Sequence, residues 1–306
     1  MINFAEIIKN VGSKIPVIVG PTASGKTSFS ISISEKINGE VISVDSRQIY
    51  KDFKIGTAQP SFEEKQAIPH HLVDIYDSDR VISAGDYVEM VENKIDDILK
   101  RKKRPVIVGG TLLYIRSICE GIIDQTDTNL EIRENIQKRI QKEGVEKLLR
   151  EMAKIDPEYS KIIHLKDLKR LVRAFEIYEL TGKSPSKVFE EQKDNDSDKR
   201  EKYFIIEIIQ NREDLYKSIE HRVDRMISQG WLDEVESLLK AGVNPKNHAM
   251  QSVGYLQLSQ VIDKKLTLAE AKVVIKQKTR QFAKRQLTWL KKMSVDYQLD
   301  LTKMNQ

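Results

Sequence analysis

The stretch GPTASGKT at residues 20–27 follows the apolar run 15–19 and satisfies the pattern G-x-x-x-x-G-K-[ST]. In this pattern the glycines let the backbone bend until successive N–H groups converge on an anion, the lysine adds positive charge, and the threonine hydroxyl can bind Mg²⁺. A candidate helix runs from Gly25 to about Ile37, and a second apolar run follows at 41–44. The order predicts a βαβ unit that carries a phosphate-binding loop.

Composition sets the class of protein. The chain has 306 residues, of which 40% are hydrophobic and 32% charged, enough for one large domain or for a core with an inserted module. No run reaches the length that a membrane helix needs, and the N-terminal residues lack a signal-peptide core, so we expect a cytoplasmic protein that is not bound to a membrane. The single cysteine, Cys119, excludes an internal disulfide and a cysteine-based metal site.

Asp45 follows the second apolar run directly. Ligands of open α/β sheets bind at the carboxyl ends of the strands, so Asp45 is predicted to lie beside the phosphate loop. Two functional roles are open: a ligand of Mg²⁺ or of its water, or a general base. The structural alternative is an aspartate that caps the next element.

The remaining patterns predict an α/β fold, a P-loop NTPase-like parallel sheet flanked by helices, with an inserted all-α domain. Further strands are expected at 105–110 and 203–209, and helices at 212–239 and 268–292. The segment between the expected strands 105–110 and 203–209 is mostly helical in pattern. Residues 1–123 and 203–306 therefore form the predicted core, and residues 124–202 form the predicted insertion.

Basic residues cluster in two places. Net charge is only +5, from 51 basic and 46 acidic residues, but Lys272 to Lys292 contains eight basic residues and no acidic one. In the insertion, the predicted helix 165–180 carries a cationic stripe at helical spacing, formed by Lys166, Lys169, Arg170 and Arg173. Such asymmetry is typical of proteins that bind a polyanion, and a solvated helix face is the alternative.

Taken together, the motifs resemble those of the tRNA dimethylallyltransferase family, also called tRNA isopentenyltransferases. The resemblance extends from about residue 15 to 292. It rests on GPTASGKT (20–27), VDSRQIY (44–50), IGTAQP (55–60), PHHLVDI (69–75), SAGDY (83–87), VGGT (108–111), KRLVRAFEIYELTGKSPS (169–186), RVDRMI (222–227), VGY (253–255) and TRQFAKRQLTW (279–289).

The resemblance implies an activity and its partners. Members transfer the dimethylallyl group of dimethylallyl diphosphate to the exocyclic N6 amine of adenosine-37, immediately 3′ of the tRNA anticodon, and release pyrophosphate with Mg²⁺. The adenosine must be flipped out of its stack to reach a buried site. The implied partners are the tRNA anticodon stem-loop and dimethylallyl diphosphate, and we expect a monomer.

The family's functional residues map onto this chain one by one. The implied catalytic residues are Asp45 as base, Lys26, Thr27 and Arg222, with Thr27 also the Mg²⁺ ligand, directly or through water. Diphosphate contacts are implied for Gly20, Thr22, Ala23, Ser24, Gly25, Lys26, Thr27 and Arg222. RNA contacts are implied for Asp45, Ser46, Arg47, Gln48, Thr111, Arg133, Lys169, Arg170, Arg173, Arg280, Lys284 and Arg285.

Four positions depart from the family pattern. Gln59, Gln251 and Leu256 stand where basic residues are common, and Leu112 stands where many relatives have glycine. Three other functions compete with the family reading. A kinase of a nucleotide or small metabolite would turn over ATP without RNA. An isopentenyltransferase that acts on free AMP or ADP would not need the insertion. A non-catalytic RNA-binding protein would not need Asp45 beside a phosphate loop.

Overall fold

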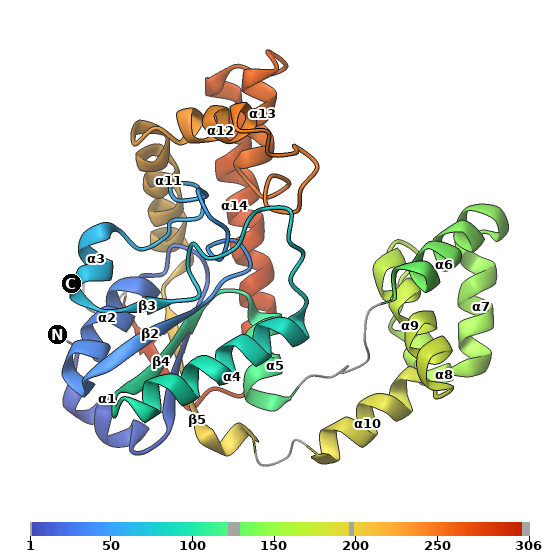
Figure 1. Ribbon diagram of the computed structural model, residues 1–306, viewed down its shortest axis with the longest axis horizontal. Coiled ribbons are helices and arrows are strands. Elements are labelled where there is room, and N and C mark those ends of the chain that lie inside the picture. Colours follow the sequence, from blue (N-terminus) through green and yellow to red (C-terminus); the bar gives the residue numbers. More distant parts are fainter. Residues whose placement is uncertain (1, 122–128, 196–198, 302–306) are drawn as a thin grey trace. The chain divides into compact units, whose positions relative to one another are not determined.

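The computed structural model describes residues 2–121, 129–195 and 199–301. The chain divides into two compact units: residues 1–119 with 201–306, and residues 120–200 (Figure 1). The expected boundary between residues 123 and 124 lies outside the described residues. The chain re-enters the first unit at Glu201, close to the expected residue 203.

The first unit contains a parallel sheet of six strands in the order β3-β2-β4-β1-β5-β6. The strands are β1 (Ile15–Val19), β2 (Gly39–Val44), β3 (His70–His71), β4 (Arg104–Gly109), β5 (Tyr203–Ile209) and β6 (Tyr297–Asp300). Both faces of the sheet are covered, because Ile18 and Ile206 on one face and Val17 and Ile205 on the other are all fully buried. The predicted fold class is confirmed.

Helices flank this sheet (Figure 1). Phe29 and Ile33 of α2 pack with Ile7 of α1 against the β1 side chain Ile18, while α4 contacts β2 and β4. The helices of this unit are α1 (Phe4–Val11), α2 (Lys26–Ile37), α3 (Phe62–Ala67), α4 (Ala84–Lys100), α5 (Leu112–Glu120), α11 (Arg212–Ser228), α12 (Trp231–Lys240), α13 (Tyr255–Ile262) and α14 (Leu268–Leu290). The 3₁₀ helix η1 (Lys199–Lys202) spans the boundary between the two units.

The expected helix at 212–239 is wrong in one respect. It is two helices, α11 and α12, because the chain turns at Gly230, whose φ of 94° is in the left-handed region. Strand β6 was not expected. Strand β4 lies between β1 and β2, so the two strands of the predicted βαβ unit are not direct neighbours.

The second unit is built from helices alone among its described residues. They are α6 (Leu130–Glu143), α7 (Val145–Ile155), α8 (Pro157–Lys161), α9 (Leu168–Thr181) and α10 (Pro185–Asn195). Ile136, Leu148, Met152 and Phe175 form part of its core. The start of α9 is set by Asp167, whose carboxylate accepts a hydrogen bond from Arg170 N. In the described parts of both units, no helix has the length and apolarity to span a bilayer.

Candidate active site

The predicted phosphate loop connects β1 to α2. Ala23 and Gly25 have φ values of 64° and 87°, so the loop passes through left-handed conformations before α2 begins at Lys26. A Cβ at Gly20 would lie 2.8 Å from Ser24 Oγ and 2.9 Å from Ile208 O, so a side chain would force a shift there. The unpaired backbone N–H groups at the start of a helix make this end positive, as an anion site requires.

Gln286 of α14 holds the phosphate loop in place. Its Oε1 accepts a hydrogen bond from Thr22 N at 2.8 Å, and its Nε2 donates to Gly110 O at 2.9 Å. The buried amide thus joins the loop to the end of β4. Sequence reasoning did not single out Gln286, because the basic residues around it dominated the pattern.

The phosphate loop forms one wall of an open groove of about 1100 Å³. Residues 23–28 line it together with His221, Arg222 and Arg225 of α11. Burial and the neighbouring Arg222 lower the pKa of Lys26 to about 7, while Asp45 opposes this shift. Burial also lowers the pKa of Arg222. Both shifts are expected of cations that are removed from water and lie near another cation.

Asp45 lies at the end of β2 on a second cavity of about 340 Å³. Its Oδ1 accepts hydrogen bonds from Arg47 N at 2.8 Å and from Gln48 N at 3.3 Å. The capping role considered for Asp45 is therefore present in the structure. Its Oδ2 has no hydrogen-bond partner among the described residues, so one carboxylate oxygen is left for a ligand.

The cavity beside Asp45 adjoins the phosphate groove, because Arg222 and Met226 line both. Much of its remaining wall is apolar. This part is formed by Ile219, Val223, Met226, Trp231, Val253 and Phe282. The arrangement places a carboxylate and a hydrocarbon surface directly beside the groove that the phosphate loop lines.

Three of the other predicted RNA contacts, Ser46, Arg47 and Thr111, line the cavity with Asp45. Ser46 N donates to Thr111 Oγ1 at 3.1 Å, and the Arg47 guanidinium contacts the ring of His248. Gln48 is not brought to the cavity wall. Its amide accepts from Ser43 Oγ and donates to the carbonyls of Thr57 and Ala58, so it braces the neighbouring loop instead.

That loop, residues 53–60, is held by Glu234 of α12. One carboxylate accepts hydrogen bonds from the N–H groups of Lys54, Ile55 and Gly56 at 2.6 to 3.1 Å, and from Tyr255 Oη at 2.6 Å. The loop lines both the groove and the cavity. Sequence reasoning missed Glu234, since nothing near it in the chain indicates this role.

Trp231 packs against the same loop. A Cβ at Gly56 would lie 2.0 Å from its Nε1, and one at Gly254 would lie 2.0 Å from its ring. Both glycines are therefore required for the indole to fit. They belong to IGTAQP and VGY, so these two motifs meet around one side chain.

The departures Gln59 and Gln251 have internal roles. Gln59 Nε2 donates to the carbonyls of Gln48 and Tyr50, at 2.9 and 3.0 Å. Gln251 Nε2 donates to Pro245 O at 2.7 Å, and the residue also lines the cavity. Nothing in the structure explains Leu256.

Comparison with known proteins decides the family. The sequence model described as IPP transferase matches residues 48–293. The chain belongs to the IPP transferase family. It is 43% identical over 281 residues to a tRNA dimethylallyltransferase of Halothermothrix orenii, covering 92% of this chain and 85% of the relative.

Solved structures of IPP transferases agree with this assignment. A tRNA isopentenylpyrophosphate transferase of Bacillus halodurans has 34% identity and a TM-score of 0.68, with 95% of this chain and 91% of that chain covered. A eukaryotic dimethylallyltransferase described as acting on tRNA has 31% identity and a TM-score of 0.81, with 96% and 75% covered. The resemblance seen in the sequence is confirmed.

In this IPP transferase, the cationic residues of the insertion are partly engaged by acids. The fully buried Glu176 binds Arg133 Nε at 2.9 Å and also pairs with Arg173. Arg170 lies 3.3 Å from Asp167. Lys169 is exposed and forms no ion pair with another described residue. The stripe therefore carries less net charge than its sequence suggests.

The basic segment of α14 is also less positive than its sequence indicates. Lys272 and Lys276 both pair with Asp224 of α11, and Arg280 pairs with Glu220 at 2.6 Å. These acids come from another helix, so the segment alone could not reveal them. Lys284 and Arg285 remain exposed on the described surface.

Replacing Glu234 with alanine is expected to destabilise the protein by about 2 to 3 kcal/mol, because three backbone N–H groups and the Tyr255 hydroxyl lose their acceptor. We expect turnover to fall about tenfold as the loop shifts. Urea unfolding and steady-state kinetics measure both effects. Glu236→Ala removes a half-exposed carboxylate of the same helix that pairs only with Lys240 among the described residues, and is the control. A change below about 0.5 kcal/mol for Glu234→Ala would contradict the proposed clamp.

Proposed function

We propose that this protein transfers the dimethylallyl group of dimethylallyl diphosphate to the N6 amine of an adenosine next to the anticodon of tRNA. The observation that carries the proposal is the shared wall at Arg222. It places the Asp45 carboxylate in a cavity that adjoins the phosphate-loop groove. The names of the relatives point to the same reaction.

The groove suits the departing diphosphate. In the reaction the bond between carbon and oxygen of the donor breaks, and negative charge builds on the pyrophosphate. The N–H groups of the loop, Lys26 and Arg222 surround the position where this charge develops. Preorganised donors of this kind stabilise a transition state because they need no reorganisation during the reaction.

Asp45 supplies the base. The adenine amine is a poor nucleophile because its lone pair is delocalised into the ring. The amine nitrogen forms the new bond to carbon, pyrophosphate leaves, and the Asp45 carboxylate accepts the proton that the amine loses. The apolar side chains of the same cavity, such as Val223 and Phe282, offer a surface for the hydrocarbon group.

The groove could hold Mg²⁺ with a single protein ligand, Thr27. Thr27 lines the groove, and its hydroxyl makes no hydrogen bond to another described residue. Among the described residues there is no group of three or more His, Cys, Asp or Glu side chains that could hold a metal. Mg²⁺ is commonly held by substrate phosphates, water and one or two protein groups, so Thr27 would suffice. When bound, it neutralises charge on the diphosphate.

The RNA side of the proposal rests on exposed cations. Lys169 and Arg170 in the insertion, and Lys284 and Arg285 on α14, would contact RNA phosphates and make binding depend on salt. The adenosine itself must leave its stack to reach Asp45.

The test is nucleoside analysis of tRNA after incubation with the protein, Mg²⁺ and labelled dimethylallyl diphosphate. We expect label in N6-dimethylallyladenosine next to the anticodon, together with equimolar pyrophosphate. Parallel reactions contain AMP or ADP in place of tRNA, and ATP in place of the donor. Labelled AMP or ADP without labelled tRNA, or ATP turnover without RNA, would contradict the proposal.

A further inference from the structure

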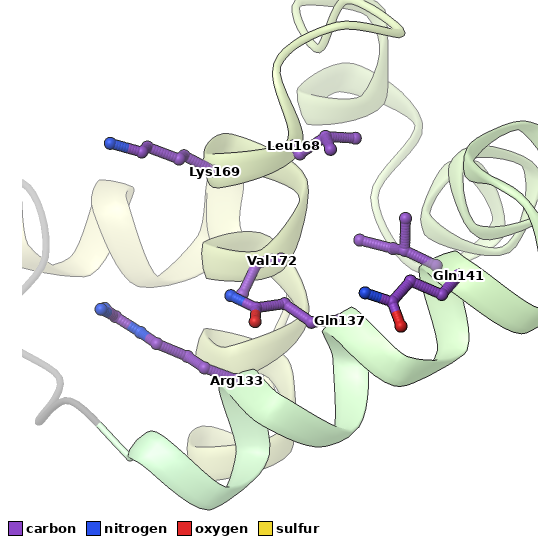
Figure 2. Close-up of a pocket in the computed structure, with 7 residues that line it drawn as sticks. Arg133, Gln137, Gln141, Leu168, Lys169 and Val172 are labelled. Atoms are coloured by element: carbon purple, nitrogen blue, oxygen red, sulfur yellow. The ribbon is translucent and has the colours of Figure 1, made fainter. Parts of the chain in front are cut away.

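The insertion contains a cavity of its own, which lies between α6 and α9 and has a volume of about 310 Å³. Six of its lining residues are labelled in Figure 2: Arg133, Gln137, Gln141, Leu168, Lys169 and Val172. The volume is at the lower end of the range of small-ligand pockets. The cavity therefore has room for a ligand of small size.

Two amides stand at this cavity without protein partners. Gln137 and Gln141 are one helical turn apart on α6, so their side chains lie on the same face. Both are exposed, and neither forms a hydrogen bond with another described residue. Each amide offers two donors and an acceptor, which can match the edge of a nucleobase.

Apolar side chains lie beside these amides. Leu168, at the start of α9, is 42% exposed although it is a large hydrophobic residue, and Val172 lies one turn further along. An exposed leucine beside unpaired amides offers a surface for the flat face of a base.

Two basic side chains also line the cavity. Figure 2 shows the side chains of Arg133 and Lys169 extending in the same direction from α6 and α9. Glu176 holds Arg133, whose Nε donates to both carboxylate oxygens at 2.9 Å. Although burial raises it, the pKa of Glu176 is held below its usual value by hydrogen bonds from Arg133, Arg173 and Asn129 N. The ionised carboxylate therefore keeps Arg133 oriented.

We propose that this cavity binds one unpaired nucleotide of the RNA substrate, with Gln137 and Gln141 reading the edge of its base and Arg133 and Lys169 holding its phosphates. The inference rests on the proposed function. A paired base cannot enter, because its edge is occupied and its faces are stacked. Sequence-specific RNA recognition generally uses unpaired bases for this reason.

The experiment measures binding of the full-length protein to a panel of anticodon stem-loop RNAs. Each RNA differs at one unpaired loop position, and every such position is tested with each of the four bases in turn. We expect the wild type to prefer one base at one position. Gln137→Ala and Gln141→Ala should reduce that preference by about tenfold. Lys169→Ala should instead weaken the binding of all these RNAs alike. It should also reduce by about one the slope of log affinity against log salt concentration. Asn135→Ala removes an exposed amide from another face of α6 and should change nothing.

Alanine favours helices, so these variants should fold, and circular dichroism checks this. Gln137→Glu provides a second test, since it removes the donors and keeps the acceptors, and it should change which base is preferred. Equal effects of the glutamine variants on every RNA, or no effect, would overturn the base-reading role. The proposed function is tested separately: it fails if the wild type forms no dimethylallyladenosine in tRNA, whatever the base preference in binding.

Discussion

Asp45→Asn is expected to lower kcat by about 10²- to 10⁴-fold, while the affinity for tRNA stays close to that of the wild type. The asparagine oxygen can still accept hydrogen bonds from Arg47 N and Gln48 N, as Asp45 Oδ1 does, so the turn should survive. The fall in rate then comes from the Oδ2 position, where the amide NH₂ of asparagine cannot accept a proton. Single-turnover rates with saturating donor measure this effect.

Asp214→Asn is the matched control for this experiment. Asp214 is a carboxylate in the first turn of α11 that accepts a hydrogen bond from the Asn211 side chain and does not line the cavity. Its replacement should leave the rate within about twofold of the wild type. A wild-type rate for Asp45→Asn would exclude Asp45 as the base.

Lys26→Met should lower turnover by about 10²- to 10³-fold, the usual effect of removing one donor that stabilises developing negative charge. The Lys26 ammonium now donates to Pro21 O at 2.7 Å and faces Arg222 in the groove. Lys36→Met, at the other end of α2, removes an exposed lysine that lies over the Phe4 ring, and its rate should match the wild type. A Lys26→Met rate close to that of Lys36→Met would rule out this role for Lys26.

The same lysine predicts how pyrophosphate affinity depends on pH. With the pKa of Lys26 near 7, the free protein loses this charge as pH rises above 7, whereas a bound anion raises the pKa and restores the proton. Binding above pH 7 must therefore take up a proton. Affinity should be highest below pH 7 and fall up to tenfold per pH unit above it. Calorimetry of pyrophosphate binding in two buffers of different ionisation enthalpy measures the number of protons taken up. Lys26→Met serves as the baseline, because pyrophosphate's own titration affects both proteins. Equal pH profiles would contradict the prediction.

Much of the fold could be predicted because its signals are local. The apolar runs at β1 and β5 have the lengths of buried strands, and glycines and a lysine at fixed spacing indicate an anion loop wherever they follow a strand. Asp45 could be placed for the same reason, since it directly follows a strand of the sheet.

The remaining features depend on residues far apart in the chain. Gln286 and Glu234 act on loops more than 170 residues earlier, as the pairs Gln286 with Gly110 and Glu234 with Gly56 show. The acids that neutralise Lys276 and Arg280 also lie on another helix. Charge counted along one segment cannot include such partners, so the sequence overstated how positive α14 is.

The position of β1 between β4 and β5 has a consequence for synthesis of the chain. The ribosome makes β1 and β4 before the insertion, but β5 only after it. Until residues 203–209 emerge, one edge of β1 is an unpaired apolar edge in the nascent polypeptide, of the kind that chaperones protect. The phosphate loop, which follows β1, therefore reaches its final surroundings late, after the insertion has had time to fold.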